Sequence, residues 1–386
     1  MKFFIDFATG SLNKYGEELC GDKVEFYNDD KMFIAVLSDG LGSGVKANIL
    51  ATLTAKIAIT MLREGLRIEE VVDTVMHTLP VCTERNLAYS TFTIIKVAHD
   101  GIVYIAEFDN PSIFFLSDRE IKKIEWSTTE INGRKVKESK FKLEENDMLV
   151  FVSDGVVHAG VGKILNLGWQ WEHIEQYLKK NTSKVMSSKA VTNLLLGACD
   201  QLYMQQPGDD TTVATIKAVT PSKVVLFSGP PIDINKDKEV VDKIMSTSGK
   251  KIICGGTAAN IVARELGQEI KSSLNLVDKD IPPIGYIKGI DLVTEGVLTL
   301  RKATEKLEKI KESTDLDFLY KEDGASKLAK ILYEDCTHIK LVIGRAINPA
   351  HQNPDFPNEL SIKLYVLNEL KNTLISLGKI VEVEFY

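Results

Sequence analysis

The sequence predicts an α+β domain over residues 1–219, followed by an α/β domain over residues 220–386. The chain has 386 residues, which is long for one hydrophobic core and comfortable for two. In the first part the strand-like runs and the helices are grouped separately, whereas in the second part they alternate. The break is expected at Thr220-Pro221, because buried strands and helices alternate beyond it, and no exposed linker of any length or low-complexity segment separates the two parts.

Three strand-like runs open the first domain: KFFIDFA, DKVEFYN and KMFIAVLS. A long helix is expected from about Val45 to Arg63, because Ala, Leu and Ile cover most of its faces. The segment from Ser90 to Trp126 is a series of short β-rich runs whose turn residues have the spacing of hairpins. The other expected elements are the helices IEEVVDTVMHTL, Trp169 to Leu178 and Ser187 to Leu202, and the strands RKVKESKFKL, DMLVFVS and TTVATIKAV.

The second domain has three runs that indicate buried strands, KVVLFSGPP, KKIICGGTAAN and HIKLVIGRA, with the helical stretches DKEVVDKIMST and VLTLRKATEKLEKIKE between them. In Ile253 to Leu266, the backbone N–H groups of a helix start could hold an anion, but a tight turn with Thr257 as N-cap is favoured. Thr294 and Glu295 could stand at another helix start. The loop PAHQNPDFP has no evident purpose.

Bulk properties exclude several classes of protein. The net charge of −7 and a pI near 5.6 do not favour a nucleic-acid partner. No run of about 18 apolar residues is present, so no membrane span is expected, and the N-terminus does not have the pattern of a signal peptide. The five cysteines are scattered and form no C-x-x-C pair, which argues against zinc and suits reduced thiols in the cytoplasm.

Four aspartates stand at predicted strand ends, each with a glycine beside it: Asp22, Asp39, Asp154 and Asp209. Glycine lets the backbone turn sharply and lets a ligand approach closely. Several carboxylates brought together repel one another when desolvated, and a divalent cation removes that cost. Ligation by oxygen alone points to Mg²⁺ or Mn²⁺. Two such ions could share a bridging water and lower its pKa, so that it could attack a phosphoryl group.

The segments CGDKVEF, LSDGLGSGVKA, VSDGV and GDDTT occur in the order and rough spacing of the metal-dependent PP2C-type serine/threonine phosphatases. The chain looks most like the bacterial branch typified by the stage II sporulation phosphatase, over about residues 1–218. The resemblance implies a four-layer α-β-β-α sandwich. It also implies hydrolysis of phosphoserine or phosphothreonine by a water held between two Mn²⁺ or Mg²⁺ ions.

The resemblance also implies a role for each motif residue. Asp39 would bridge both metals, together with the backbone carbonyl of Gly40. Asp22 would hold the second metal, and Asp154 and Asp209 the first. Asp39, Asp154 and Asp209 are therefore the expected catalytic residues.

Other motif positions are expected to support the ligands, and some differ from the residues usual in the family. Asp210 is expected to orient its neighbour, and Thr212 to be structural. Leu41 stands where the eukaryotic branch has a histidine, so the leaving oxygen must obtain its proton elsewhere, for example from a metal-bound water. The turn Asp109 to Ser112 replaces a longer turn that contains glycine, which leaves the substrate loop undefined.

Several alternatives remain open. The four aspartates could be turn residues that cap the next element, although their paired context favours the metal site. The run GLGSG invites a dinucleotide site, but a full G-x-G-x-x-G needs glycine at Val45. His158 is expected at the surface rather than at the rim of the site, and Trp169 and Trp171 are expected to be packing residues.

The sequence therefore predicts a cytoplasmic phosphoprotein phosphatase of bacterial signalling, acting on a phosphorylated protein. The main alternative is a non-catalytic module that binds phosphoproteins, and a nucleotide-dependent oxidoreductase is a third. The second domain resembles no family that we recognise. It could sense a ligand, bind a partner or mediate a homodimer.

Overall fold

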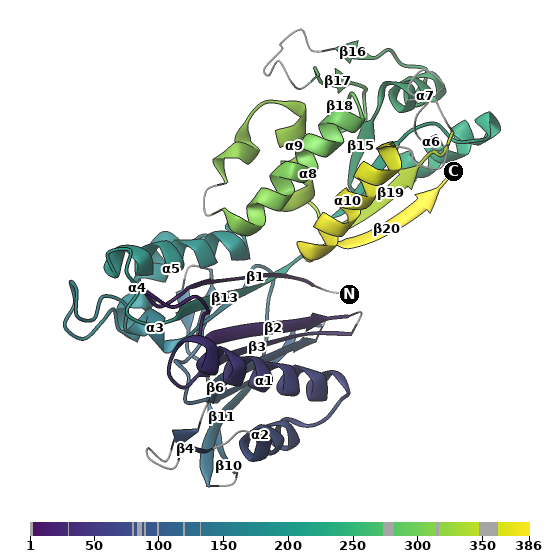
Figure 1. Ribbon diagram of the computed structural model, residues 1–386. Coiled ribbons are helices and arrows are strands. Elements are labelled where there is room, and N and C mark those ends of the chain that lie inside the picture. Colours follow the sequence, from purple (N-terminus) through teal and green to yellow (C-terminus); the bar gives the residue numbers. More distant parts are fainter. Residues whose placement is uncertain are drawn as a thin grey trace. The chain divides into compact units, whose positions relative to one another are not determined.

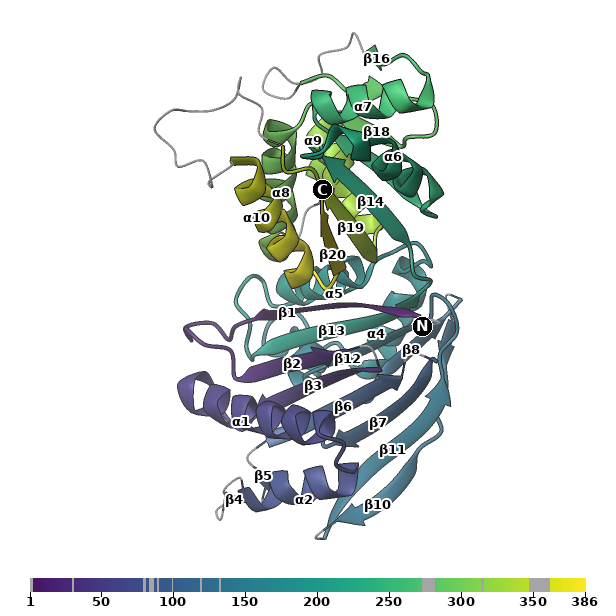
Figure 2. The same cartoon turned by 90° about the vertical axis from the view of Figure 1, so that its right-hand side faces the viewer.

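The structure is a computed structural model (Figures 1 and 2). It describes residues 3–29, 31–78, 81–82, 87–88, 90–98, 100–118, 120–131, 133–272, 282–313, 316–346 and 362–386. The loop PAHQNPDFP and His99 lie outside the described residues. The chain divides into two compact units, Met1–Thr220 and Pro221–Tyr386. Each unit is described by itself.

The first unit contains two large antiparallel sheets, the helices that cover them and the short antiparallel pair β4-β5. The strands are β1 Phe4–Leu12, β2 Asp22–Asn28, β3 Met32–Gly40, β4 Val81–Cys82, β5 Leu87–Ala88, β6 Ser90–Ala98, β7 Ile102–Phe108, β8 Phe114–Ser117, β9 Glu120–Lys122, β10 Ser127–Ile131, β11 Arg134–Lys142, β12 Met148–Val152 and β13 Thr211–Val219. The helices are α1 Gly44–Arg63, α2 Ile68–Thr78, α3 Asp154–Val157, α4 Trp171–Asn181 and α5 Ser188–Leu202.

The two sheets stack face to face with helices outside them, which confirms the predicted four-layer sandwich (Figure 2). One sheet has the order β1-β13-β12-β8-β9 and the other β10-β11-β7-β6-β3-β2. Phe33, Leu37, Phe151 and Ile216 meet in the core between the sheets. Alternate residues of the same strands face the helices, because side chains along a strand alternate between its two faces.

Helix α1 lies along β2 and β3 and buries Ala47, Ala51 and Ala55 completely. Contrary to the expectation from the sequence, this helix is long and apolar enough to span a membrane by length and composition, with a mean hydropathy of 1.4. That is weak evidence for a membrane segment, because the core helices of soluble proteins pass the same test.

The sequence located the long elements of this unit to within a few residues. The expected helix Val45 to Arg63 and the expected strand TTVATIKAV correspond to α1 and β13. The dinucleotide interpretation of GLGSG is wrong, because β3 pairs antiparallel with both β2 and β6 and so belongs to no parallel βαβ unit.

The second unit is built on one seven-stranded sheet of order β16-β17-β18-β15-β14-β19-β20. The strands are β14 Lys223–Ser228, β15 Lys250–Cys254, β16 Lys271–Ser272, β17 Gly285–Tyr286, β18 Leu292–Thr294, β19 His338–Ile343 and β20 Ile380–Phe385. The helices are η1 Ile234–Lys236, α6 Asp237–Ser246, α7 Gly256–Leu266, α8 Val297–Glu312, η2 Asp317–Tyr320, α9 Gly324–Glu334 and α10 Ile362–Ser376. The strands β18, β15, β14, β19 and β20 are parallel, which confirms the α/β class.

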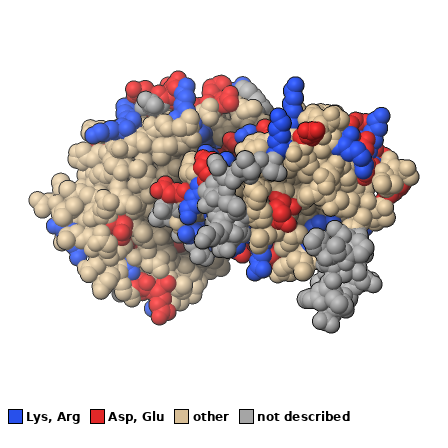
Figure 3. Space-filling view, turned by 90° about the horizontal axis from the view of Figure 1, so that it is seen from above, with Lys and Arg blue, Asp and Glu red and all other residues tan. Residues whose placement is uncertain are grey.

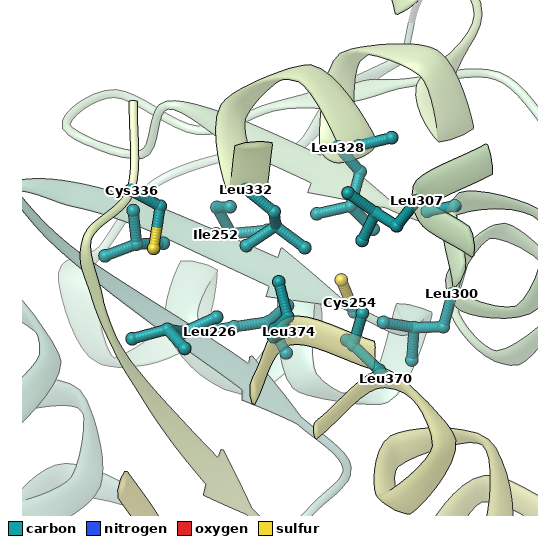
Figure 4. Close-up of a cluster of buried hydrophobic side chains, with 14 of the residues drawn as sticks. Leu226, Ile252, Cys254, Leu300, Leu307, Leu328, Leu332, Cys336, Leu370 and Leu374 are labelled. Carbon is teal, nitrogen blue, oxygen red and sulfur yellow. The ribbon is translucent and has the colours of Figure 1, made fainter. Parts of the chain in front are cut away.

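Helices cover both faces of this sheet. Leu226, Ile252 and Leu341 face α8, α9 and α10, whose leucines fill that side of the core (Figure 4). The neighbouring residues Phe227 and Ile253 face α6 and α7 on the other side. A sheet buried on both faces explains the continuous apolar runs of its central strands.

Some elements of the second unit were not predicted. Strand β18 has three residues and lies inside the segment GIDLVTEGVLTL, whose pattern favours a helix start. Strand β20, with the sequence IVEVEF, is at the edge of the sheet and lacks a long apolar run. On the face drawn in Figure 3, basic and acidic side chains are interspersed.

Glu107 in β7 provides a test of this fold. Its buried carboxylate accepts hydrogen bonds from the Ile113 backbone N–H at 2.9 Å and from the Ser112 hydroxyl at 3.1 Å. Burial outweighs these bonds and raises the pKa of Glu107 to about 7. Because the folded-state pKa is above the unfolded value, Glu107 lowers stability as the pH rises from 4.5 to 7.

We therefore expect Glu107→Gln to become more stable than the unchanged chain as the pH rises. The difference between their free energies of unfolding should increase by about 3 kcal/mol between pH 5 and pH 8, measured by urea denaturation. Glu130→Gln, at an exposed position of β10, is the control and should give no such trend. A pH-independent difference for Glu107→Gln would contradict this account.

Candidate metal centre

Two of the predicted aspartates face each other across neighbouring strands. In the antiparallel pairing of β2 with β3, Asp22 is the direct partner of Asp39. Side chains of directly paired residues lie on the same face of a sheet, about 5 Å apart at their Cβ atoms. Asp22 is almost fully buried, and Asp39 is partly buried.

The other two aspartates come from neighbouring strands of the second sheet. Asp154 follows β12, and Asp209 precedes β13, so the antiparallel pairing of these strands brings them to the same end of the sheet. Two hydrogen bonds hold this end together: the Ser153 N–H donates to the Thr212 carbonyl at 3.0 Å, and the Thr212 N–H donates to the Ser153 hydroxyl oxygen at 2.8 Å.

The ends of the two sheets meet at Gly21 and Asp210. A Cβ on Gly21 would lie 2.8 Å from Oδ2 of Asp210, so the loop before β2 touches the loop before β13. The Lys14 N–H donates to Asp210 Oδ1 at 3.0 Å. The structure thus gathers the acidic motifs, which are far apart in the chain, where these two loops touch.

Glycine is required where helices approach this end of the sandwich. A Cβ on Gly40 would overlap the carbonyl oxygen of Ala47 in α1, and a Cβ on Gly155 would overlap the carbonyl oxygen of Asp210. The glycines of the motifs therefore allow the close packing that holds the aspartates together.

The electrostatics of the cluster show that its members interact. Burial raises the pKa of Asp39, and the charges of Asp22, Asp154 and Asp209 raise it further. Burial is also the main cause that raises the pKa of Asp22, only partly offset by the nearby Ser153 hydroxyl.

Three carboxylate oxygens of the cluster are buried without a hydrogen-bond partner: Oδ1 and Oδ2 of Asp22 and Oδ2 of Asp210. Although the hydroxyl groups of Ser153 and Thr212 lie close enough to lower the pKa of Asp22, neither makes a well-formed hydrogen bond to it. A buried carboxylate without a partner is costly, so the cluster has the unsatisfied oxygens that a hard divalent cation binds.

The donor set fits Mg²⁺ or Mn²⁺ in chemistry, but the side chains must still converge. Among the described residues, no group of three or more His, Cys, Asp or Glu side chains is already close enough to hold a metal ion. Asp22 and Asp39 already share one face of the sheet through their direct pairing on β2 and β3.

Some residues of the centre carried no signal in the sequence. The Lys14 ammonium lies 3.9 Å from Asp209 Oδ1, in a loop of mixed polar residues that had no motif. The buried Tyr203 hydroxyl donates to the Gly155 carbonyl at 2.8 Å and holds the VSDGV turn from α5. His158 is half-exposed, as expected, but its Nδ1 lies 3.9 Å from Asp154 Oδ2, which places it at the rim.

Comparison with known proteins agrees with this geometry. Residues 29–219 match the family model of stage II sporulation protein E (SpoIIE). The chain is similar to the solved PP2C phosphatase domain of the cell fate determinant SpoIIE from Bacillus subtilis, determined with a fragment of its regulatory domain. That match has 20% identity and a TM-score of 0.50, and covers 57% of this chain and 64% of that one. It therefore spans less than two thirds of the Bacillus chain.

Two further solved structures are less similar. The RsbU and RsbW domains of a Mycobacterium tuberculosis protein match with 15% identity and a TM-score of 0.48, over 62% of this chain and 67% of that one. The catalytic domain of the serine threonine phosphatase PstP, in complex with two manganese ions, matches with 14% identity and a TM-score of 0.39, over 56% and 99%. At these identities the likeness concerns the fold alone. No curated protein matches the chain.

Asp22→Asn tests whether the centre is electrostatically strained. Without metal, the substitution removes a buried carboxylate that lacks hydrogen bonds, so we expect it to stabilise the protein above neutral pH. Because the folded-state pKa of Asp22 is raised, the gain should be near zero at pH 4 and increase to the order of 3 kcal/mol at pH 8.

The measurement is thermal unfolding in EDTA across this pH range. Asp118→Asn is the matched control, because Asp118 is exposed and pairs with Lys184 at the surface. A destabilised Asp22→Asn protein at pH 8 would show that the carboxylate is well accommodated without a cation.

Proposed function

The first unit belongs to the stage II sporulation protein E family of PP2C-type phosphatase domains, and we propose that the chain is a phosphoprotein phosphatase that uses two Mn²⁺ or Mg²⁺ ions to hydrolyse phosphoserine or phosphothreonine. The observation that carries this proposal is the set of buried carboxylate oxygens without partners at the meeting point of the two sheets. Their cost is tolerable where a cation binds, and phosphoryl transfer is a reaction that such cations assist.

Residues from both sheets would hold the ions. Asp39 and the Gly40 carbonyl lie at the end of β3, and the charges of Asp22, Asp154 and Asp209 all act on Asp39. Asp22 lies on one side, and Asp154 and Asp209 come from the other sheet. When bound, the ions supply Lewis acidity and positive charge for a phosphoryl group.

Other side chains would position the substrate. The Lys14 ammonium is about one-third exposed beside Asp209, where it can contact phosphoryl oxygens. Leu41 offers no proton to the leaving oxygen, and the His158 imidazole lies at the rim, 3.9 Å from Asp154 Oδ2. We further propose that the substrate is a phosphorylated protein of a cytoplasmic signalling pathway.

The activity is tested by incubating the full chain with a phosphoserine peptide, with Mn²⁺ or with EDTA. We expect phosphate release only with the metal, and a decrease of about 100-fold or more in Asp39→Asn, because the substitution removes a central ligand. Asp118→Asn should keep its activity. Release that is independent of Mn²⁺, or unchanged in Asp39→Asn, would contradict the proposed mechanism.

One observation favours a second function, a phosphoprotein-binding module without catalysis. Within the described residues, no three acidic side chains are yet arranged to hold a metal ion. If the module is the correct function, the unchanged chain binds the phosphopeptide without turnover, and Asp39→Asn binds it equally well.

A further inference from the structure

In the parallel sheet of the second unit, the direction in which successive strands are added reverses at β14. This strand comes first in the chain and lies in the middle, with β15 and β18 added on one side and β19 and β20 on the other. In open α/β sheets, ligands bind beyond the carboxyl ends of the strands next to such a reversal, because the connections there diverge to opposite faces. A ligand is therefore expected at the carboxyl edge of the sheet around β14.

Four adjacent strands end level at this edge, and a glycine lies just beyond each. The register pairs Cys254 with both Ser228 and Thr294, and Ser228 with Ile343. The glycines beyond these ends are Gly229, Gly255, Gly296 and Gly344. Larger residues would not fit at either end of the row: Gly296 has a φ of 147°, and a Cβ on Gly344 would overlap the Pro230 carbonyl oxygen. The edge thus presents bare backbone, which lets a ligand approach closely.

Two helices begin side by side at this edge. Helix α7 has 11 residues and Gly255 as its N-cap, and α8 has 16 residues and Gly296 as its N-cap. The favoured assignment of Thr257 as N-cap is wrong, because Thr257 lies inside the first turn of α7. Neither N-cap supplies a side chain to the free N–H groups. A Cβ on Gly296 would lie 3.2 Å from the Gly255 Cα, so the positive ends of both helix dipoles meet.

Thr299 in the first turn of α8 has a hydroxyl group without a hydrogen-bond partner in the described part of the chain. The residue is 1% exposed. Helical side chains lean toward the N-terminus of their helix, so the Thr299 side chain leans toward the start of α8. Its methyl group lies 3.7 Å from the position of a Cβ on Gly324, the first residue of α9. An unsatisfied buried hydroxyl is destabilising, and such a group indicates a missing partner.

Lys363, near the start of α10, places its ammonium group beyond the carboxyl ends of β14 and β19. Its ammonium donates to the Gly344 carbonyl at 2.6 Å, and a Cβ on Gly229 would overlap its Nζ. No carboxylate lies within 4.0 Å of the Lys363 ammonium among the described residues. Among the described residues, its ammonium donates to the Gly344 carbonyl alone, which leaves two N–H donors for a ligand.

We propose that this edge is a binding site for a phosphorylated small molecule, in which the first turns of α7 and α8 and the Thr299 hydroxyl hold a phosphate and Lys363 holds a second anionic group. Backbone N–H groups at helix starts bind phosphate without further specialisation. The exposed Glu295 carboxylate, between Thr294 and Gly296, repels a bare anion but accepts a hydrogen bond from a hydroxyl group. This combination favours a nucleotide, with a ribose beside its phosphates, over free phosphate.

The test is isothermal titration of the full chain with ADP, NAD⁺ or inorganic phosphate, in EDTA so that the first unit holds no metal. We expect at least one nucleotide to bind with a Kd below about 1 mM and more tightly than phosphate. Phosphate binding as tight as that of the nucleotides would support the anion site with free phosphate as its ligand. The absence of binding by all three probes at about 1 mM would overturn the proposal.

Two variants locate the site. Thr299→Val and Lys363→Met should each weaken binding by about tenfold or more, because each removes one direct contact. The matched controls are Thr304→Val, whose hydroxyl already donates to the Leu300 carbonyl at 2.9 Å, and Lys371→Met on the same helix as Lys363. Both controls should bind the probe normally.

Stability gives a second readout that does not depend on a probe. Thr299→Val should raise the melting temperature of the unliganded chain, because it removes a hydroxyl that has no partner, whereas Thr304→Val should lower it. Normal binding by both Thr299→Val and Lys363→Met would overturn the proposal, as would a lowered melting temperature in Thr299→Val.

Discussion

The mutual repulsion of buried carboxylates is the constraint on which the first unit depends. Asp22 and Asp39 are direct neighbours on paired strands, and Asp154 and Asp209 approach them from the other sheet. Burial makes each charge more costly, which is why the pKa values of Asp22 and Asp39 are raised. The sandwich can bring these groups together because Gly40 and Gly155 allow α1 and the loop before β13 to pack against the strand ends. Divalent cations would neutralise these carboxylates, and relief of their repulsion would strengthen cation binding.

The second unit also places its polar groups at strand ends, but these groups attract the opposite charge. In both units the loops at strand ends carry the polar groups, while the strands supply rigid and apolar support. In the first unit these loops present acids, whereas in the second they present helix N-termini, a buried hydroxyl and the Lys363 ammonium. The first arrangement suits cations and the second suits anions. A chain with both has the parts for the proposed phosphatase and for the proposed binding of a phosphorylated small molecule.

The sequence predicted the features that depend on local pattern. Long apolar runs such as MFIAVLS and helices such as Val45 to Arg63 were located because their burial requires a long, mostly apolar segment. The acidic motifs were found because each has a glycine beside an aspartate. What could not be predicted depends on contacts distant in the chain: the three-residue strand β18 needs its neighbour β15, and Lys14 meets Asp209 only when the sheets stack. The N-cap of α7 was missed because Thr257 is the better cap by residue type, but the helix begins at Gly256.

Proton release on metal binding tests the central claim most directly. If the carboxyls of Asp22 and Asp39 retain protons near neutral pH because they are crowded and buried, a cation must displace those protons as it binds. Titration calorimetry of Mn²⁺ into the full chain, in buffers of different ionisation enthalpy, measures the protons released. We predict net proton release at pH 6 that declines as the pH is raised toward 9. Mn²⁺ binding without proton release at pH 6 would contradict the account.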